Sequence, residues 1–440
     1  MNINEFTWKF HDFEKRYVRA GDWAVWDIVR FEVSCILFYP STKPMSQKAI
    51  SSKGIFHHLV LLFRFLKALM KSYDYIIFSC SRFRNEDGCQ YDPNILDIYP
   101  KVKQSALCID SYFSTGSYEY PVIFDYPLKI RGKFLSRCKL KISFPDYILK
   151  GLEAEFGQKI DADYIHFLLM RFQNDKAHYI RLFRWFKPKA VFLVQNGVQK
   201  GLFAAARQCQ ITVVELQHGL VDFSHLVYSY PKGIDTEYLS LPSYFFVYSE
   251  FWKNRIHYPV KEIVIAGNTM AARVETSPKI YDLAIIAADI YMSELFVFLD
   301  ELLDGNYEGK VCLKLHPNQL DEVDFIREKY KYCPNIEIIY TEISVKKIIA
   351  QSKAVLVVQS TCVYEALDAG VKVYILKKLD YMIHQDVFDH PLICLINSAD
   401  DYLLGKDGIE KNGNQIKFFE PFDNLKVDLF FHDVLLSGDK

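Results

Sequence analysis

The chain has 440 residues, more than one hydrophobic core usually organises, so two domains are expected. Half of the residues are apolar and 15% are aromatic, a composition that excludes an intrinsically disordered protein. The formal net charge of −1 gives no sign of a nucleic-acid binder, and we expect no nucleic-acid partner.

The cysteines and the N-terminus indicate a cytoplasmic protein. The ten cysteines include no Cys-x-x-Cys pair, and several stand inside apolar runs, as Cys312 does. We therefore expect reduced core cysteines and no zinc site. Residues 1–9 lack the basic-then-apolar order of a signal peptide. The most apolar stretch, 56–70, is interrupted by Arg64 and Lys67 and is too short to span a bilayer.

From about residue 73, short apolar runs alternate with longer helical patterns. Strands are predicted at 75–78, 121–124, 190–194, 211–216, 244–248 and 262–268, and helices at 163–186 and 198–208. Apolar strands without polar alternation, separated by helices, are typical of a parallel sheet that is covered on both faces.

The strand signal is lost over 269–280, which we interpret as an interdomain linker. It separates a predicted domain 1–268, with a helical N-terminal extension, from a predicted domain 281–440. In the second domain the alternation restarts, with strands predicted at 282–286, 311–315, 336–339, 354–358 and 371–376. The predicted fold is therefore α/β, with two doubly wound units that face each other across a cleft at the carboxyl ends of their strands.

The first motif is Gln217-His218-Gly219, which directly follows the predicted strand 211–216. Catalytic groups gather at the carboxyl ends of parallel strands, and a glycine lets the chain turn there. Because histidine titrates near neutrality, His218 can take a proton from an acceptor hydroxyl as a general base. The alternative is a structural histidine bonded to a neighbouring carbonyl.

A polar and aromatic loop, 221–231, follows this motif. Asp222 in this loop is a second candidate for the general base. The aromatic side chains of the loop can stack on sugar rings and form an acceptor pocket. The predicted acceptor contacts are Gln217, Gly219, His225 and Tyr228, with ordinary polar loop residues as the alternative.

The second motif, Lys314-Leu315-His316-Pro317, also stands at a strand end. Pro317 stops the strand and keeps the preceding residue extended, so the side chain of His316 is directed outward. His316 is suited to contact a phosphate or a leaving group, and Lys314 or the next helix N-terminus adds positive potential. We therefore predict donor binding by Lys314, His316 and Pro317.

The third motif follows the predicted strand 354–358 and contains Gln359, Ser360, Thr361 and Glu365. A hydroxyl at the point where a buried strand becomes a helix can hold a phosphate together with free backbone amides. Glu365 lies one turn further along, where it can reach the ribose of a donor. An ordinary helix cap with a capping-type glutamate is an equally good interpretation.

The order of these motifs, with Ala-Gly-Asn at 266–268 between the first and the second, resembles bacterial surface-polysaccharide glycosyltransferases of the GT-B fold. The most similar patterns belong to capsule and lipopolysaccharide enzymes that use CMP-sialic acid or CMP-Kdo, and to CDP-glycerol glycerophosphotransferases. The resemblance covers roughly residues 185–380 and does not extend to the first 150 residues.

The resemblance implies that His316, Ser360 and Thr361 hold the donor phosphate and that Glu365 binds the ribose or the base. It also implies that His218 matches the histidine that serves as base in glycerophosphotransferases. The sialyltransferase-like pattern has an acidic-acidic-Gly base motif instead, and this sequence has no clean copy of it. The resemblance therefore leaves the donor open.

The function predicted from the sequence is transfer of a sugar from a nucleotide-activated donor, with a CMP-sugar favoured, to a growing cell-surface polysaccharide or lipopolysaccharide. No Asp-x-Asp motif stands at a convincing strand end, so we expect no metal and no cofactor, and stabilisation of the leaving group by helix N-termini and His316. The alternatives are a CDP-glycerol-type polyol phosphotransferase, a nucleotide-sugar 2-epimerase and a non-catalytic glycan-binding assembly subunit, since a fold alone does not fix a function.

Two basic segments suggest peripheral contact with anionic lipid at the inner face of the cell membrane. Residues 129–141 contain six lysines and arginines and no acidic residue, and residues 56–71 mix large apolar side chains with basic ones. On an anionic membrane each such cation contributes about 1 kcal/mol. A solvated charged surface is the alternative. Membrane contact fits an enzyme that extends a lipid-linked glycan acceptor.

Overall fold

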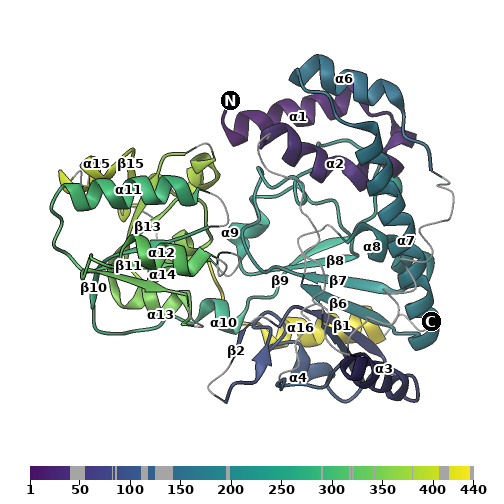
Figure 1. Ribbon diagram of the computed structural model, residues 1–440. Coiled ribbons are helices and arrows are strands. Elements are labelled where there is room, and N and C mark those ends of the chain that lie inside the picture. Colours follow the sequence, from purple (N-terminus) through teal and green to yellow (C-terminus); the bar gives the residue numbers. More distant parts are fainter. Residues whose placement is uncertain are drawn as a thin grey trace. The chain divides into compact units, whose positions relative to one another are not determined.

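The computed structural model describes residues 1–39, 55–81, 83–84, 87–110, 117–123, 142–194, 199–288, 291–316, 319, 322–340, 343–378, 380–405 and 416–436 (Figure 1). The chain divides into two compact units. The first unit comprises Phe6–Met270 and Phe422–Lys440, and the second comprises Met1–Glu5 and Ala271–Pro421.

The first unit is built on a parallel seven-stranded sheet with the order β5-β4-β1-β6-β7-β8-β9. From β1 the chain moves outward on one side and then crosses back to β6, which is the doubly wound pattern. Because helices cover both faces, the strands are mainly apolar, with Asp110 and Glu215 as buried exceptions, and β6 is fully buried. The strands are β1 (Tyr75–Ser79), β4 (Ala106–Asp110), β5 (Val122–Ile123), β6 (Ala190–Val194), β7 (Thr212–Leu216), β8 (Tyr244–Val247) and β9 (Glu262–Ile265).

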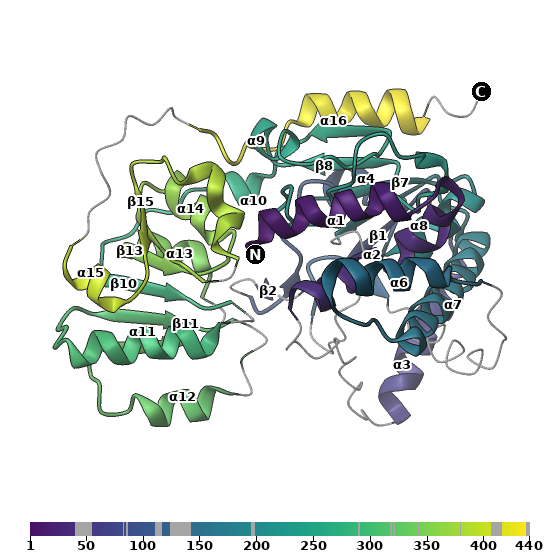
Figure 2. The same cartoon turned by 90° about the horizontal axis from the view of Figure 1, so that it is seen from above.

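Helices pack on both faces of this sheet, while α1 and α2 lie near α6 and α7 (Figures 1 and 2). One core cluster joins α3, α7 and α8 to the face that carries Ile76, and another joins α4 and α16 to the face that carries Ile77. The helices are α1 (Ile3–Tyr17), α2 (Trp23–Phe38), α3 (Ile55–Ala68), α4 (Tyr99–Val102), α6 (Asp146–Phe156), α7 (Ala162–Phe186), α8 (Lys200–Gln208), α9 (Glu250–Lys253), α10 (Thr269–Ala272) and α16 (Asn424–Phe430), and a short hairpin is formed by β2 (Phe83–Arg84) and β3 (Gln90–Tyr91).

The second unit contains a parallel six-stranded sheet with the order β12-β11-β10-β13-β14-β15. Helices α11, α12 and α15 share a core cluster with one face, and α13 and α14 pack on the other face (Figure 2). The elements are β10 (Tyr281–Ile286), α11 (Met292–Asp304), β11 (Val311–Lys314), α12 (Val323–Lys329), β12 (Ile336–Ile339), α13 (Val345–Ala350), β13 (Ser352–Val357), α14 (Cys362–Asp368), β14 (Lys372–Leu376), β15 (Ile393–Ile396) and α15 (Ala399–Leu403), with a 3-10 helix at Tyr381–Val387.

The two sheets confirm the predicted fold class of α/β with two Rossmann-like, doubly wound units of the GT-B type. Every predicted strand is present, and β4 and β15 are additional. The division differs from the predicted domain 281–440 at its C-terminal end, where the Phe430 ring packs on Tyr244 and Phe246 with centroid distances of 4.8 and 5.0 Å. The segment from Phe422 onward therefore completes the first unit.

Candidate functional site

The loop after β7 carries the predicted base, and the side chain of Gln217 fixes its shape. The Gln217 side-chain carbonyl accepts a hydrogen bond from the Tyr248 amide, and its side-chain NH₂ donates to the Gly219 carbonyl, both at 2.9 Å. Gln217 is only 1% exposed, whereas His218 is exposed. Gln217 thus stabilises the turn through its two hydrogen bonds, and the turn exposes His218 to solvent.

Asp222, the alternative base, is buried and its carboxylate already has partners. One oxygen accepts hydrogen bonds from the Ser224 hydroxyl at 2.8 Å and the His225 amide at 2.9 Å. The other oxygen lies 3.4 Å from the Arg255 guanidinium. Both carboxylate oxygens are thus engaged within the protein, which favours a loop-positioning role for Asp222.

Of the predicted acceptor residues, Tyr228 lies inside the fold and His225 is half-buried. The His225 ring stacks on Phe31 at a centroid distance of 5.7 Å, and burial together with the nearby His218 lowers its pKa to about 4. Tyr228 is 1% exposed, and its hydroxyl donates to the Glu215 carboxylate at 3.0 Å. The stacking face predicted for Tyr228 is therefore covered by protein. A loop sequence does not reveal such burial, because the partners come from distant segments.

A buried ion pair in α1 and α2 holds this loop from the other side. Two nitrogens of Arg30 donate to the two carboxylate oxygens of Glu14 at 2.7 and 3.0 Å. Arg30 also donates to the carbonyls of Leu226 and Ser229. The N-terminal helices, for which the sequence suggested no role, thus shape the loop that carries His218.

A hollow at the carboxyl ends of β7, β8 and β9 encloses about 280 Å³. Two sequence motifs meet in its lining, Gln217 from the Gln-His-Gly turn and Gly267 and Asn268 from Ala-Gly-Asn. Gly267 has a φ of +70°, a conformation that favours glycine. Tyr248 and Asn94 also line the hollow, and the Tyr248 hydroxyl donates to the Asn94 side-chain oxygen at 3.2 Å. Polar groups therefore share the lining of this hollow with apolar side chains such as Leu216 and Phe246.

Sequence reasoning missed two buried carboxyl groups of the first unit, Asp92 and Asp110. Asp110 ends β4 and accepts hydrogen bonds from the Ser79 hydroxyl at 2.9 Å and the Ser81 amide at 3.0 Å. Asp92 accepts from the Asn94 amide and side chain, and burial raises its pKa. The sequence does mark Asp110 as a charged residue at the end of an apolar run, but this run was not predicted as a strand.

In the second unit the predicted donor residues follow β11 and β13, the two strands that flank β10. The switch point of a sheet with this strand order lies between β10 and β13, where ligands of such folds bind. The His316 amide donates to the Gln319 side chain at 2.9 Å, and Gln319 in turn donates to the Ala288 carbonyl at 3.0 Å. Gln319 thus ties the His316 loop to the end of β10.

Lys314 is 8% exposed and points along the same edge. Its ammonium group donates to the Leu315 carbonyl at 3.3 Å, and burial lowers its pKa although the thiols of Cys312 and Cys362 oppose that shift. Cys362 is the first residue of α14. Its backbone amide donates a hydrogen bond to the Ser360 hydroxyl at 3.2 Å. The structure therefore gathers Lys314, His316, Gln359, Ser360 and Thr361 at one edge, while Pro317 lies outside the described residues.

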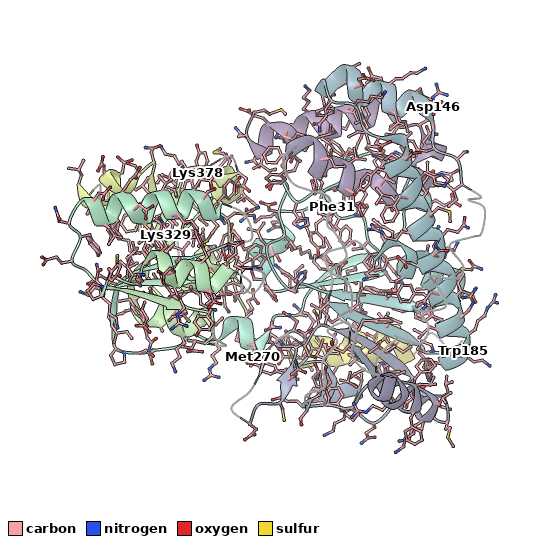
Figure 3. The ribbon with its side chains drawn as sticks, viewed as in Figure 1. Phe31, Asp146, Trp185, Met270, Lys329 and Lys378 are labelled. Carbon is pink, nitrogen blue, oxygen red and sulfur yellow. The ribbon has the colours of Figure 1, made fainter. Side chains whose placement is uncertain are left out.

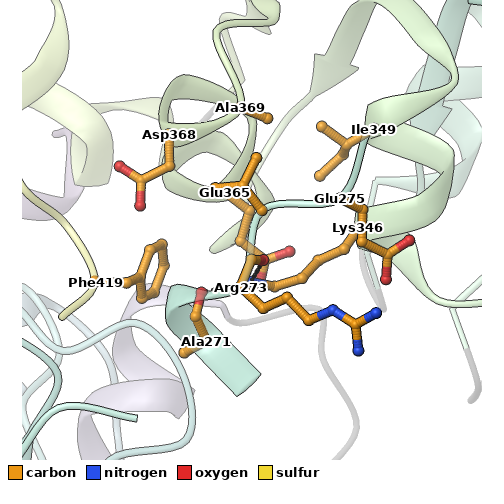
Figure 4. A pocket seen from close by; sticks show the side chains of 10 residues that line it. Ala271, Arg273, Glu275, Lys346, Ile349, Glu365, Asp368, Ala369 and Phe419 are labelled. Atoms are coloured by element: carbon orange, nitrogen blue, oxygen red, sulfur yellow. Dashed lines mark hydrogen bonds between the residues drawn. The ribbon is translucent and has the colours of Figure 1, made fainter. Parts of the chain in front are cut away.

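Glu365 lines a different hollow, which encloses about 260 Å³ (Figure 4). Burial raises the pKa of Glu365, and burial also raises that of Asp368 to about 6. Lys346 extends across this hollow and donates to the carbonyls of Ala271 and Arg273, and burial lowers its pKa. Its lining includes none of the other predicted donor residues that the structure describes. The role of Glu365 at the ribose or the base of a donor, which the resemblance implied, stays a prediction.

The comparisons with known proteins give a general likeness of fold. No family model and no curated protein matches the chain. A solved UDP-GlcNAc 2-epimerase from Methanocaldococcus jannaschii, in complex with UDP-GlcNAc and UDP, is 15% identical over 83% of this chain and 99% of its own, with a TM-score of 0.47. UDP-GlcNAc 2-epimerase from Neisseria meningitidis is 13% identical over 83% of this chain and 100% of its own, with a TM-score of 0.45. Acinetobacter baumannii MurG is 12% identical over 74% of this chain and 86% of its own, with a TM-score of 0.40. Similarities of this size identify no activity for the chain.

The chemistry available at the two sheet edges differs. The edge of the second sheet offers an ammonium, an imidazole and two hydroxyls, which are groups that bind an anion such as a phosphate. The edge of the first sheet offers an exposed imidazole and a hollow lined by amide and hydroxyl groups, which suit a proton acceptor and a polyhydroxylated ligand.

Proposed function

We propose that this chain is a glycosyltransferase that moves a sugar from a nucleotide-activated donor, with a CMP-sugar favoured, to a growing cell-surface polysaccharide or lipopolysaccharide. The observation that carries the proposal is the set of Lys314, His316, Ser360 and Thr361 at the carboxyl ends of the two strands that flank β10. A nucleotide donor presents its phosphates as the anion for which this edge is suited.

In this proposal the second unit binds the donor and the first unit binds the acceptor. His316 and Lys314 stabilise the negative charge that develops on the leaving phosphate, aided by the hydroxyls of Ser360 and Thr361. His218 takes the proton from the acceptor hydroxyl as that oxygen attacks the anomeric carbon. Gln217 positions His218 through its two hydrogen bonds within the turn.

A panel of nucleotide donors tests the proposal, with the released nucleotide detected by mass. Release of CMP from a CMP-sugar in the presence of a glycan acceptor is the expected result. Release of CMP from CDP-glycerol would instead identify a polyol phosphotransferase, and conversion of a UDP-sugar without acceptor would identify a 2-epimerase. If no donor in the panel is turned over, the result would support a non-catalytic glycan-binding subunit and refute the proposal.

Calorimetry on His316→Ala tests the donor site directly. Loss of a charge-assisted contact worth about 1.5–3 kcal/mol should weaken nucleotide affinity by roughly tenfold or more. His390→Ala is the matched control, because His390 precedes β15 and lies toward the opposite edge of the same sheet. Unchanged affinity in folded His316→Ala protein would remove His316 from the donor site.

A further inference from the structure

The outer surface of α3 carries large apolar side chains that the fold leaves exposed. Phe65 and Ala68 point into the core, whereas Phe63 is 69% exposed and Leu66 is 51% exposed. Leu62 and Met70, four residues before and after Leu66, are exposed as well. Leu62 and Leu66 share one stripe of α3, and Met70 follows two residues after the end of the helix at Ala68, so these exposed apolar residues are near one another.

The end of α7 extends this apolar stripe. The Phe65 ring contacts Trp185 and Phe186 at centroid distances of 6.1 and 6.2 Å, which fixes α3 beside the last turn of α7. Trp185 is 47% exposed at the outer end of α7 (Figure 3). We call the group of Leu62, Phe63, Leu66, Met70 and Trp185 the α3–α7 surface.

The charged residues around the α3–α7 surface are basic. Neither residues 55–73 nor residues 176–189 contain an aspartate or a glutamate. The acidic residue that follows α3 is Asp74, which lies 3.9 Å from the Lys189 ammonium. The exposed cations on these two segments are Arg64, Lys67, Lys71, Arg184, Lys187 and Lys189.

We propose that the α3–α7 surface docks on an anionic lipid bilayer. Its apolar side chains would enter the boundary between headgroups and acyl chains, with the Trp185 indole at the headgroup level and the flanking cations on lipid phosphates. Charge complementarity selects this partner, because each cation near an anionic membrane surface contributes about 1 kcal/mol. Among the described helices none is long and apolar enough to cross a bilayer, so the contact is peripheral.

This inference does not depend on the reaction proposed above, since lipid binding needs no substrate. The sequence pointed to residues 56–71 and to 129–141, and the latter lie outside the described residues. The last turn of α7 is the part that only the structure brings to this surface.

Sedimentation with vesicles tests the proposal on the full-length protein. We expect binding to vesicles of phosphatidylglycerol and phosphatidylcholine, and at least tenfold weaker binding to phosphatidylcholine alone. Phe63→Ser with Trp185→Ser, and separately Lys67→Glu with Arg184→Glu, should each reduce partitioning by tenfold or more. Phe325→Ser with Tyr332→Ser is the control, because these residues of the second unit are equally exposed but lie outside the surface, and it should bind as wild type does.

Three results would overturn the proposal. The first is absence of binding to anionic vesicles, and the second is equal loss in the control variant. The third is a dimer in sedimentation velocity that Phe63→Ser with Trp185→Ser abolishes while vesicle binding is unchanged, which would assign the surface to a second copy of the chain. A midpoint of thermal unfolding equal to that of the wild type shows that a variant is folded. Misfolding is then excluded as the cause of any loss of vesicle binding.

Discussion

Breaking the buried Glu14–Arg30 pair should cost more than removing both partners together. Glu14 is fully buried and Arg30 is 1% exposed, and the Trp26 indole also donates to Glu14 at 2.7 Å. Glu14→Leu leaves the Arg30 guanidinium with only backbone carbonyls, and Arg30→Met leaves the Glu14 carboxylate with only the Trp26 indole. Each single change should destabilise the first unit by about 3–5 kcal/mol, because it leaves an uncompensated buried charge. The double variant removes both charges of this pair together, so it should cost less than the sum by about 3 kcal/mol or more.

Urea unfolding followed by circular dichroism measures all four proteins of this cycle. Asp12→Ala is the control, since it breaks the exposed pair with Arg16 on the same helix and should leave the unfolding midpoint unchanged. Additive single and double effects would refute the reasoning, as they would show that the two charges do not depend on each other. The same variants should lose turnover, because Arg30 holds the carbonyls of Leu226 and Ser229 in the loop that follows His218.

Three further outcomes are expected. Burial, with Arg30 nearby, lowers the pKa of His11 to about 3, so stability is fully present above pH 6.5 and falls as the pH drops. At pH 4.5 the loss from this residue is about 3 kcal/mol, and urea unfolding of His11→Gln should show a fall in stability smaller by about that amount. His218→Asn should leave nucleotide affinity near wild type and reduce kcat at least about a hundredfold. If Asp222→Asn instead reduces kcat this much in a folded protein with unchanged nucleotide affinity, the base is Asp222. Turnover should persist in excess EDTA, and loss of turnover that Mg²⁺ or Mn²⁺ restores would contradict the expectation of a metal-independent enzyme.

The sheets could be predicted from the sequence because buried parallel strands are continuous apolar runs. The segment Ala190–Val194 is such a run and was assigned as a strand. Ala106–Asp110 was missed, since it contains a single β-branched residue and ends in a charged one, and Ile393–Ile396 was missed as well. The partner sheet of Asn424–Phe430 was not predictable, because an amphipathic helix shows that it has an apolar face but not which surface covers it.

The candidate site was predictable only in outline. Strand ends marked His218, His316 and Ser360, because the carboxyl edge of a parallel sheet is where polar groups are expected. The sequence could not show that Asp222 and Tyr228 have buried partners, since Arg255 and Glu215 reach them only in the folded chain. Burial decides whether a polar side chain acts on a ligand or on its own loop, and burial is set by distant residues.

The division of the chain also sets an order of completion during synthesis. The second unit is contiguous from Ala271 to Pro421 apart from its five N-terminal residues, so the ribosome finishes it before the segment from Phe422 emerges. Val427 and Phe430 belong to the core of the first unit, which is therefore the last to be completed. Until α16 is synthesised, the sheet face that carries Tyr244 and Phe246 is uncovered. The nascent chain then exposes an apolar surface that is prone to aggregation.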